Sequence, residues 1–446
     1  MFFLIIILLT AVSSTLQQKV FPVKDPNNII VTFGSCNKDS KEDDSKHIFH
    51  KISALNPDIW IWLGDAAYVD HRVMPMIFTY AGETKIVKKF NEVKNSNAYS
   101  QLRNKTPIIG VWDDHDYGIN NGGKYFQHKT LTQQLYLDFL DEPEDSPRRK
   151  KEGIYESYFI GDKTKIKVIL LDVRYFKDEP SLLGGGDILG EHQWEWLEEQ
   201  FKDNQAKFTL IGSGIQILPD DRLLPECWFA NSRDRLINLI KKYKLSGVFF
   251  ISGDVHYTEI MKHPCRERVG FDLYEFTSSG VNLNYGNANT YVKKFLDTIY
   301  ADTFNTDEDR FFEENFGILT FNFEGERPRL VMEARNKQGM ELFKKEVDYM
   351  RLTFDEDLLN HEAQCVLDMS RYGRFIEKWL ESIFDLELYA ILWIIILVLI
   401  LVLAAVLIVG LHKLFSWISR IISGKGQKPK HKHKHHKHKN QREKHE

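Results

Sequence analysis

The sequence predicts an α/β fold in which strands and helices alternate along the chain. Short apolar, β-branched runs recur, and each one stops at a group of polar residues. Runs that are apolar on both faces are typical of strands buried between two layers. Amphipathic stretches of helix length separate them, which indicates sheets covered by helices. A late alternation of polar and apolar residues adds antiparallel pairing, so we expect mixed sheets.

Six apolar runs predict the buried strands. In chain order they are NIIVTF before residues 34–37, DIWIWL before 64–65, PIIGV before 112–116, KIKVILL before 172–174, FTLI before 212–214 and GVFFI before 252–256. In open α/β sheets, ligands bind beyond the carboxyl ends of the strands. We therefore expect the polar residues that follow these strands to converge at one edge.

Helices and a late hairpin fill the rest of the body. The expected helices lie at 45–55, 124–140, 190–203 and 233–243. Residues 329–347 alternate around an Asn-Lys-Gln-Gly turn, which predicts an antiparallel hairpin. Residues 272–280 and 317–323 are further strand candidates, and residues 286–315, rich in Asn, Asp and Glu, indicate a surface excursion.

The two ends of the chain have the composition of targeting segments. Residues 2–12 form an apolar core of signal-peptide length before Ser13 and Ser14, so residues 1–14 are a predicted signal peptide. No Lys or Arg precedes this core, which leaves an uncleaved anchor as the alternative. Residues 388–411 carry no charge and exceed the about 20 residues that cross a bilayer, which predicts a transmembrane helix.

The charges around that helix predict its orientation. Acidic residues precede it and basic residues follow it, which favours a single-pass type I protein of the secretory pathway or plasma membrane. The body would be lumenal or extracellular, residues 351–387 a juxtamembrane stem, and residues 412–446 a basic, His/Lys-rich cytosolic tail. That tail has eleven Lys or Arg residues against two Glu, so it could contact anionic lipids. The remaining chain is acidic, which argues against nucleic-acid binding.

Cysteine usage does not indicate a disulfide scaffold. The sequence has only Cys36, Cys227, Cys265 and Cys365. If Cys36 has another role, at most one pair forms among the other three, and Cys227–Cys265 is one candidate. Asn104-Lys105-Thr106 is a glycosylation sequon, weakened by the Pro107 behind it.

The residues at the predicted strand ends combine acidic, imidazole, phenol, amide and thiol groups. They are Cys36, Asp65, Tyr68, Asp113, Asp114, His115, Asp116, Asn120, Asp254 and His256. The sequence contains neither a Gly-x-Ser-x-Gly elbow nor a P-loop, which excludes those two kinds of site. Crowded carboxylates repel each other, and burying them unpaired is unfavourable.

Metal ions would make such a cluster favourable. Di- or trivalent cations turn the repulsion among Asp65, Asp113, Asp114 and Asp254 into attraction, and oxygen ligands suit Ca²⁺, Mg²⁺, Mn²⁺ or Fe³⁺. Two neighbouring cations can also hold the attacking and leaving oxygens of a phosphoryl transfer. The residue types therefore predict a metal-dependent site for phosphate chemistry.

Four motifs together resemble a known family. GSC (34–36), GDAAY (64–68), WDDHDYGINN (112–121) and SGDVH (252–256) are similar to the signature of alkaline phosphatase D-type, or PhoD-like, metallophosphatases of the calcineurin-like metallophosphoesterase superfamily. Supporting stretches are LLDVRYF (170–176), GEHQWEWLEEQ (190–200), IGSGIQ (211–216) and FTSSG (276–280). The resemblance places a domain of this kind at about residues 28–350.

The resemblance implies a four-layer α-β-β-α sandwich with a metal centre between the sheets. It also implies hydrolysis of phosphate mono- or diesters by a metal-bound hydroxide. It implies iron with calcium as the metal set, although other divalent metals remain open. Asp65 would bridge the metals, with Cys36 and Tyr68 as ligands to the iron. Asp113 or Asp114, together with Asn120, Asp254 and His256, would complete the coordination.

Two further residues have open roles. His115 could protonate or orient the leaving oxygen, or it could hold a ligand carboxylate in place. Arg174 could bind phosphate oxygens, or it could form a structural ion pair.

Three functions follow from this pattern. The first is a membrane-anchored metallophosphatase acting on phosphate esters outside the cytosol. The second is a lipid-directed phosphodiesterase, motivated by a site beside the membrane. The third is a non-enzymatic, metal-stabilised ectodomain that serves as a receptor or adhesion module.

Overall fold

The computed structural model describes most of the body and one C-terminal helix. The described residues are 18–38, 47–74, 77–179, 185–219, 227–288, 290, 292–293, 310–361 and 386–422. The chain divides into two units, residues 1–380 and 381–446. The predicted signal peptide, residues 362–385 of the predicted stem and residues 423–446 of the predicted tail lie outside the described residues.

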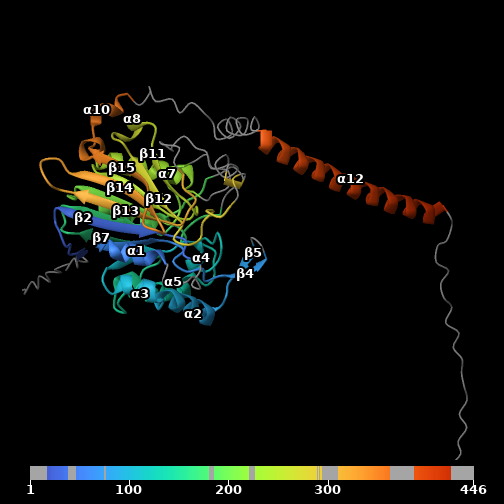
Figure 1. Ribbon diagram of the computed structural model, residues 1–446, viewed down its shortest axis with the longest axis horizontal. Helices are drawn as coiled ribbons and strands as arrows, with labels where there is room; N and C mark the ends of the chain where they lie inside the picture. The colour runs from blue at the N-terminus through green and yellow to red at the C-terminus, as the bar shows by residue number, and fades with distance from the viewer. Residues whose placement is uncertain are drawn as a thin grey trace, which may run out of the picture. The chain divides into compact units, whose positions relative to one another are not determined.

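Two mixed sheets form the body of the first unit (Figure 1). The six-stranded sheet has the order β15 (Glu341–Asp348), β14 (Arg329–Asn336), β13 (Asn315–Asn322), β2 (Asn28–Gly34), β3 (Ile59–Leu63), β6 (Ile108–Val111). The seven-stranded sheet has the order β1 (Lys19–Phe21), β7 (Glu156–Ile160), β8 (Ile166–Leu170), β9 (Phe208–Ser213), β10 (Val248–Ser252), β12 (Tyr274–Ser278), β11 (Thr258–Lys262). The expected mixed sheets and the hairpin near residues 329–347 are confirmed.

Parallel pairing within each sheet points the ends of several strands in one direction. Strands β2, β3 and β6 pair in parallel, and so do β8, β9, β10 and β12. The antiparallel strands lie toward the margins, as in the β13–β14–β15 meander. The loops that follow these parallel strands therefore gather at one edge of each sheet.

Helices cover the outer face of each sheet. On the six-stranded sheet these include α1 (Ile48–Ala54), α2 (Glu83–Lys94), α3 (Asn97–Arg103) and α5 (Lys129–Phe139), and on the seven-stranded sheet α6 (Glu191–Phe201) and α7 (Ala230–Lys242). Phe49 of α1 packs edge-on against Trp62 of β3, with ring centroids 5.7 Å apart. Leu197 of α6 and Leu236 of α7 join one buried cluster with Ile169 of β8. The four expected helical stretches are confirmed.

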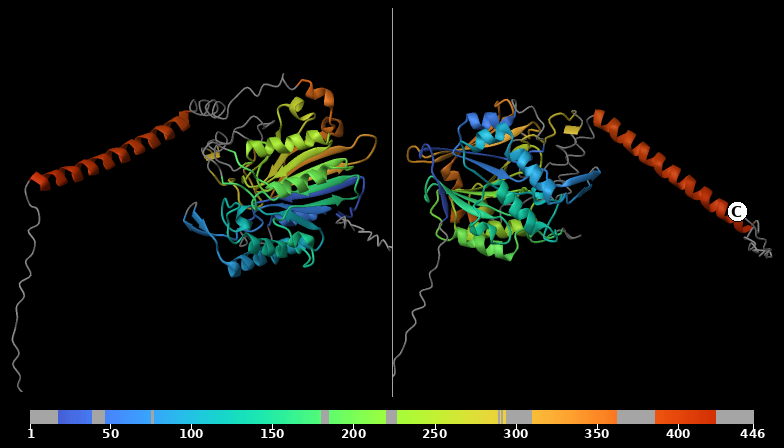
Figure 2. Two further views of the ribbon diagram at one scale, coloured as in Figure 1. Left: turned by 180° about the vertical axis from the view of Figure 1, so that it is seen from behind. Right: turned by 90° about the horizontal axis from the view of Figure 1, so that it is seen from below.

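The inner faces of the two sheets pack on each other. The rings of Phe33 on β2 and Phe276 on β12 lie 5.0 Å apart and nearly perpendicular. Along β8, Leu170 joins this inner core while its neighbour Ile169 points to the helices, as the two-residue period of a strand requires. The result is the four-layer α-β-β-α sandwich that the resemblance implied (Figure 2).

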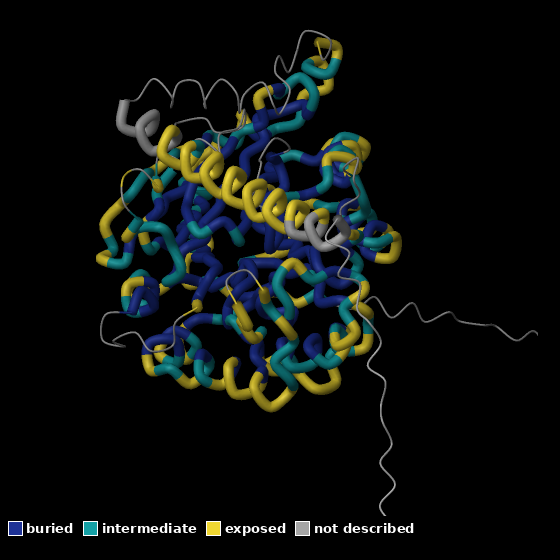
Figure 3. Tube along the Cα trace, turned by 90° about the vertical axis from the view of Figure 1, so that its right-hand side faces the viewer, coloured by how far each residue is buried: buried dark blue, intermediate teal, exposed yellow. Residues whose placement is uncertain are grey.

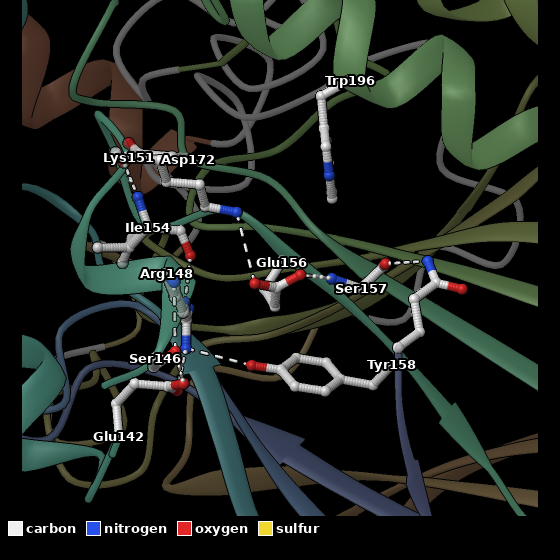
Figure 4. Close-up of polar contacts among 12 residues, drawn as sticks. Glu142, Ser146, Arg148, Lys151, Ile154, Glu156, Ser157, Tyr158, Asp172 and Trp196 are labelled. Atoms are coloured by element: carbon white, nitrogen blue, oxygen red, sulfur yellow. Dashed lines mark hydrogen bonds and ion pairs between the residues drawn. The ribbon is translucent and has the colours of Figure 1, made fainter. Parts of the chain in front are cut away.

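A buried arginine ties the two sheets together at one edge. Arg148, in the short helix η2 (Pro147–Arg149), donates from Nη2 to the carbonyl of Gly110 on β6 at 2.7 Å. Its Nη1 donates to the hydroxyl of Tyr158 on β7 at 3.2 Å (Figure 4). A cavity of about 1370 Å³ opens at this edge, and Lys151 and Trp196 are among its lining residues. None of its lining residues belongs to the strand-end motifs.

The expected Cys227–Cys265 pair is wrong. Cys265 belongs to a disulfide, whereas Cys227 does not. The backbone of Cys227 bridges to Gln216, in the loop after β9, while Cys265 caps the short helix α8 (Arg266–Val269). The two residues are thus held on different elements.

The second unit contains helix α12 (Leu386–Ile422). Within it, Trp393–Phe415 is predominantly apolar and long enough to cross a membrane, and none of its described residues is buried (Figure 3). The predicted transmembrane segment, residues 388–411, lies inside this helix. The helix continues through residues 412–422, which the sequence had assigned to the tail.

Sequence reasoning missed several elements. Among these, β4 (His71–Met74) and β5 (Ile77–Thr79) pair only with each other, as a separate two-stranded sheet. Among the described residues, the body also contains the short helices α4 (Asp114–Tyr117), α8, η3 (Tyr349–Leu352) and α10 (Glu356–Leu359).

Candidate metal centre

The polar residues that follow the strands meet in the described structure. Three groups each have ligand atoms within 4.8 Å of one another: Cys36 with Asp65 and His256, Asp65 with Asp114 and His115, and Asp113 with Asp114 and Asp254. Asp65 belongs to the first two groups and Asp114 to the last two. A carboxylate shared in this way is placed to bridge two cations.

Four of these residues have unusual backbone conformations. Cys36, Asp65, Asp254 and His256 have φ values of 63°, 51°, 71° and 63°, in the left-handed region. A non-glycine residue in this region costs roughly 1–2 kcal/mol. Strained residues of this kind cluster at functional sites, where the surrounding structure holds them. Here they turn the chain sharply at the ends of β2, β3 and β10, so that side chains from separate strands face one point.

Two glycines permit the close approach of these loops. A Cβ on Gly253 would lie 2.5 Å from Ser35 Oγ, and the residue follows β10 directly. Gly64 has a φ of +86°, and a Cβ there would lie 2.8 Å from the backbone nitrogen of Asp113. The glycines of the SGDVH and GDAAY motifs therefore let the ends of β3, β6 and β10 come together.

Asp116 holds the loop that carries Asp65. Its carboxylate accepts hydrogen bonds from the backbone N–H groups of Ala67 at 2.8 Å, Ala66 at 3.1 Å and Asp113 at 3.4 Å. The third acid of the DDHD run thus binds the protein backbone. It fixes the relative positions of the loops after β3 and β6.

Asp113 is paired with Arg174. The Nε atom of Arg174 donates to Asp113 Oδ1 at 2.6 Å, and both side chains are fully buried. Asp172 accepts hydrogen bonds from the backbone N–H of Arg174 and from the indole of Trp112, the residue before Asp113. These bonds hold the two loops that carry the ion pair. The structural ion pair is therefore observed for Arg174.

His115 is oriented by a carboxylate that sequence reasoning missed. Its Nδ1 lies 2.9 Å from Asp70 Oδ2, and the backbone N–H of Asn120 donates to the same oxygen at 3.2 Å. The ring of Tyr68 stacks at a tilt on His115, with centroids 4.1 Å apart, and the Tyr68 hydroxyl lies 3.3 Å from His256 Nε2. Asp70 lies two residues beyond GDAAY, and an acid so close to the motif was the available signal.

Two buried carboxylate oxygens support the presence of cations. Asp113 Oδ2 and Asp114 Oδ1 have no hydrogen-bond donor within the described part of the chain. A buried acceptor without a partner is unfavourable, and a bound cation would satisfy it. These two oxygens belong to residues that share a group with Asp254. The donor set therefore fits metal ions.

Burial is the main cause of the shifted pKa values of the carboxylates in the cluster, and neighbouring acids add to it. Burial raises the pKa of Asp65 to about 7 and also raises that of Asp113. Burial lowers the pKa of His115, but Asp114, Asp65 and Asp70 outweigh it and raise the pKa to about 10. Cations in the site would favour the ionised carboxylates and reverse their shifts.

The imidazole and thiol groups of the first cluster are also displaced from their usual ranges. Burial, with the nearby His115, lowers the pKa of His256 to about 4, so this imidazole is neutral at neutral pH. Burial and the charges of Asp65 and Asp254 raise the pKa of the Cys36 thiol. A neutral imidazole is the form that binds a metal, whereas the thiol must lose its proton when a cation binds.

Comparisons with known proteins identify the family of this chain and a similar fold. A family model described as PhoD-like phosphatase matches residues 31–330. No curated protein sequence matches the chain. A solved structure described as PhoD aligns over 81% of this chain and 79% of its own, with a TM-score of 0.53 and 14% identity.

Two other solved structures are less similar. A putative 5'-nucleotidase from Staphylococcus aureus aligns over 79% of this chain and 58% of its own, with a TM-score of 0.34 and 10% identity. A phosphatase from Mycoplasma pneumoniae aligns over 75% of this chain and 97% of its own, with a TM-score of 0.30 and 10% identity. The likeness to PhoD supports the fold.

Proposed function

Because this chain belongs to the PhoD-like phosphatase family, we propose that it is a metal-dependent hydrolase of phosphate mono- or diesters. The observation that carries this proposal is the pair of buried oxygens, Asp113 Oδ2 and Asp114 Oδ1, beside the shared carboxylate of Asp65. Three ligand groups linked by two shared carboxylates suit a centre with two or more ions.

The ligands divide by chemistry. Cys36, Tyr68 and His256 offer thiol, phenol and imidazole groups on one side of Asp65, which suits iron. Asp113, Asp114 and Asp254 offer oxygen ligands that suit calcium, and Asn120 is the further oxygen ligand that we propose there. When bound, such ions would neutralise phosphate charge and acidify an attacking water.

The protein groups around the ligands have distinct roles in this proposal. His115 can donate a proton to the leaving oxygen, because Asp70 holds its ring at 2.9 Å and favours the protonated form. Arg174 keeps Asp113 in place through the buried ion pair, so it acts as a positioning residue. Tyr68 packs on His115 and reaches His256, which joins the two sides of the site.

Asp65→Asn tests the proposal. We expect the turnover of p-nitrophenyl phosphate and of its bis ester to fall by more than about 100-fold, because loss of a shared ligand exceeds the effect of outer partners. The folded fraction should change little, as measured by circular dichroism. Asp138→Asn is the matched control, since this aspartate is 62% exposed on its side chain and lies outside the metal centre.

The outcome also separates the alternatives. Unchanged turnover in Asp65→Asn would reject the catalytic metal centre. Metal analysis of the purified wild-type protein chooses between iron with calcium and other sets. A protein that contains the metals but hydrolyses neither ester would be the metal-stabilised receptor or adhesion module.

We further propose that α12 anchors the protein in a membrane as a type I span, because its apolar residues 393–415 are long enough to cross a bilayer. The body would then be lumenal or extracellular and the basic tail cytosolic. Full-length protein should stay with the membrane in alkaline carbonate, whereas a chain ending at Leu380 should be released. Release of the full-length protein would contradict the anchor.

A further inference from the structure

The β4–β5 hairpin projects from the body and exposes apolar side chains. Figures 1 and 2 show it extending away from the two large sheets. Its strands hydrogen-bond only to each other. Val73 and Met74 are each 55% exposed, and Ile77 is 47% exposed. Three large apolar side chains therefore gather at the end of a projecting element.

Such an element is unfavourable in water by itself. An isolated two-stranded hairpin is at best marginally stable. Exposed apolar residues that occur singly need no explanation, but a cluster marks an interaction surface. Met74 and Ile77 are paired across the hairpin, so they lie side by side. The hairpin thus presents one apolar tip rather than scattered residues.

The same hairpin contacts His115 beside the candidate metal centre. The ring of Phe78 lies 5.2 Å from that of His115, nearly edge-on. Asp70, which immediately precedes β4, holds His115 through the 2.9 Å contact described above. The hairpin that carries the apolar tip therefore also contacts the proposed proton donor.

The charge of the hairpin favours a lipid surface over other partners. Residues 71–80 contain His71 and Arg72 but no Asp or Glu, although the chain as a whole has more acidic than basic residues. Both His71 and Arg72 are exposed. An apolar tip beside an exposed arginine, with no acidic side chain in the hairpin, suits a segment that inserts into the headgroup region of a bilayer with anionic lipids.

We propose that the β4–β5 hairpin inserts its apolar tip into the membrane that α12 spans and presents lipid phosphate esters to the metal centre. The inference rests on the proposed function and names its substrate class. The length of the chain permits this insertion, because residues 362–385, between the body and α12, could span up to about 86 Å when fully extended. In the reaction, the oxygen of water bonds to phosphorus, the ester P–O bond breaks, and the released alcohol takes a proton.

Insertion is tested without reference to activity. A nitrobenzoxadiazole label is attached at Val73→Cys in a Cys227→Ser background of the full-length protein, reconstituted in phosphatidylcholine vesicles with and without phosphatidylserine. Doxyl-labelled lipids should quench the label by about half or more, and more strongly with phosphatidylserine. The same label at Met340→Cys is the control, because Met340 is 59% exposed at the turn between β14 and β15.

Substrate delivery is tested by a ratio of rates. In Val73→Ser/Met74→Ser/Ile77→Ser, turnover of a phospholipid in vesicles should fall at least about tenfold relative to turnover of p-nitrophenyl phosphate by the same variant. Met340→Ser should leave this ratio at the wild-type value. Phosphatidic acid and phosphatidylcholine as substrates separate monoester from diester preference.

The outcomes distinguish this inference from the proposed function. Equal quenching at positions 73 and 340, or an unchanged ratio in the triple variant, overturns the inference while leaving a phosphatase of soluble esters. A third outcome is quenching of the label at position 73 while the unlabelled wild-type protein hydrolyses no ester. This outcome supports the membrane contact and rejects the proposed function.

Discussion

Arg174 Nε lies 2.6 Å from Asp113 Oδ1, and neither side chain is exposed to solvent. The two residues are 61 positions apart in the sequence, on the loops after β8 and β6. One oxygen of Asp113 is thus engaged by the protein, while the other, Oδ2, has no donor in the described part of the chain. The ion pair orients the second oxygen for a cation.

Removal of Arg174 should destabilise the protein strongly. Arg174→Met leaves the buried Asp113 without its partner, and breaking one side of a buried pair costs about 3–5 kcal/mol. Urea denaturation of chelated protein measures the change. Arg235→Met is the control, because Arg235 and Glu191 form an exposed pair, whose loss should cost less than about 1 kcal/mol. Equal effects of the two substitutions would contradict the importance of burial.

Asp116 should matter for metal binding although we do not assign it as a ligand. Asp116→Ala removes the acceptor of the Ala66 and Ala67 N–H groups, and each unsatisfied group costs about 1–3 kcal/mol. Because these bonds hold the loop of Asp65, metal affinity should fall about 10–100-fold. Calorimetric titration with metal measures it. Asp116→Asn, which keeps one acceptor oxygen, should lose less; an affinity equal to wild type in Asp116→Ala would refute this role.

Asp70 should control the proton of His115. In Asp70→Asn the hydrogen bond to Nδ1 weakens, so the pKa of His115 falls from its raised value. If His115 donates the proton to the leaving group, the decline of kcat at alkaline pH should begin at a lower pH in this variant. A pH profile of kcat measures the shift. A uniform loss of activity with an unmoved alkaline limb would instead assign His115 a purely structural role.

Removal of metal should make stability depend on pH between about 6.5 and 8. Burial raises the pKa of Asp65 to about 7 and that of Asp116 to about 8, both from 3.8. Although burial opposes it, Asp114 and other acids raise the pKa of His115 from 6.5 to about 10. In this window the folded state holds more protons than the unfolded state, so stability falls as pH rises.

Below that window the lowered pKa of His256, about 4, acts in the opposite direction. The measurement is therefore the free energy of unfolding of chelated protein at pH 6.5 and pH 8. Added metal should reduce the decline, because cations keep the carboxylates ionised throughout. Asp65→Asn should also reduce it in chelated protein, while Asp138→Asn should not. A flat profile in the chelated wild type would contradict these shifts.

Glycosylation should report the side of the membrane on which the body lies. Asn104 is exposed at the end of α3. In a lumenal body its sequon can accept a glycan, so expression in secretory cells should give a mobility shift that glycosidase treatment and Asn104→Gln both abolish. Protease protection of the body in sealed microsomes is the second measurement. Digestion of the body by protease that is added outside the sealed microsomes would contradict the type I orientation.

Local sequence patterns determined much of this protein. The apolar runs of NIIVTF, DIWIWL and GVFFI specify buried strands, because an apolar residue on both faces of a strand requires cover on both sides. Polar residues after parallel strands share an edge, so the meeting of Asp65, Asp114 and Asp254 was predictable. The length and composition of residues 388–411 likewise specified an apolar helix.

Tertiary structure decided which partner each side chain has. Asp113 and Asp116 are neighbours in one acidic run, yet one pairs with Arg174 and the other binds backbone N–H groups. No sequence pattern distinguishes them, because their partners come from loops that only the packed sheets bring near. The contact of Asp70 with His115 and the disulfide of Cys265 depend on the same packing.

The sequence by itself therefore determined the strands, the acidic cluster at their ends and the apolar C-terminal helix, because each depends on residues that are close along the chain. Only the tertiary structure decided that Asp114 is shared between two ligand groups, that Asp70 holds His115, and that the β4–β5 hairpin projects beside His115. The physical reason is that side-chain partners are selected by distance in space, and loop geometry sets that distance independently of local propensity.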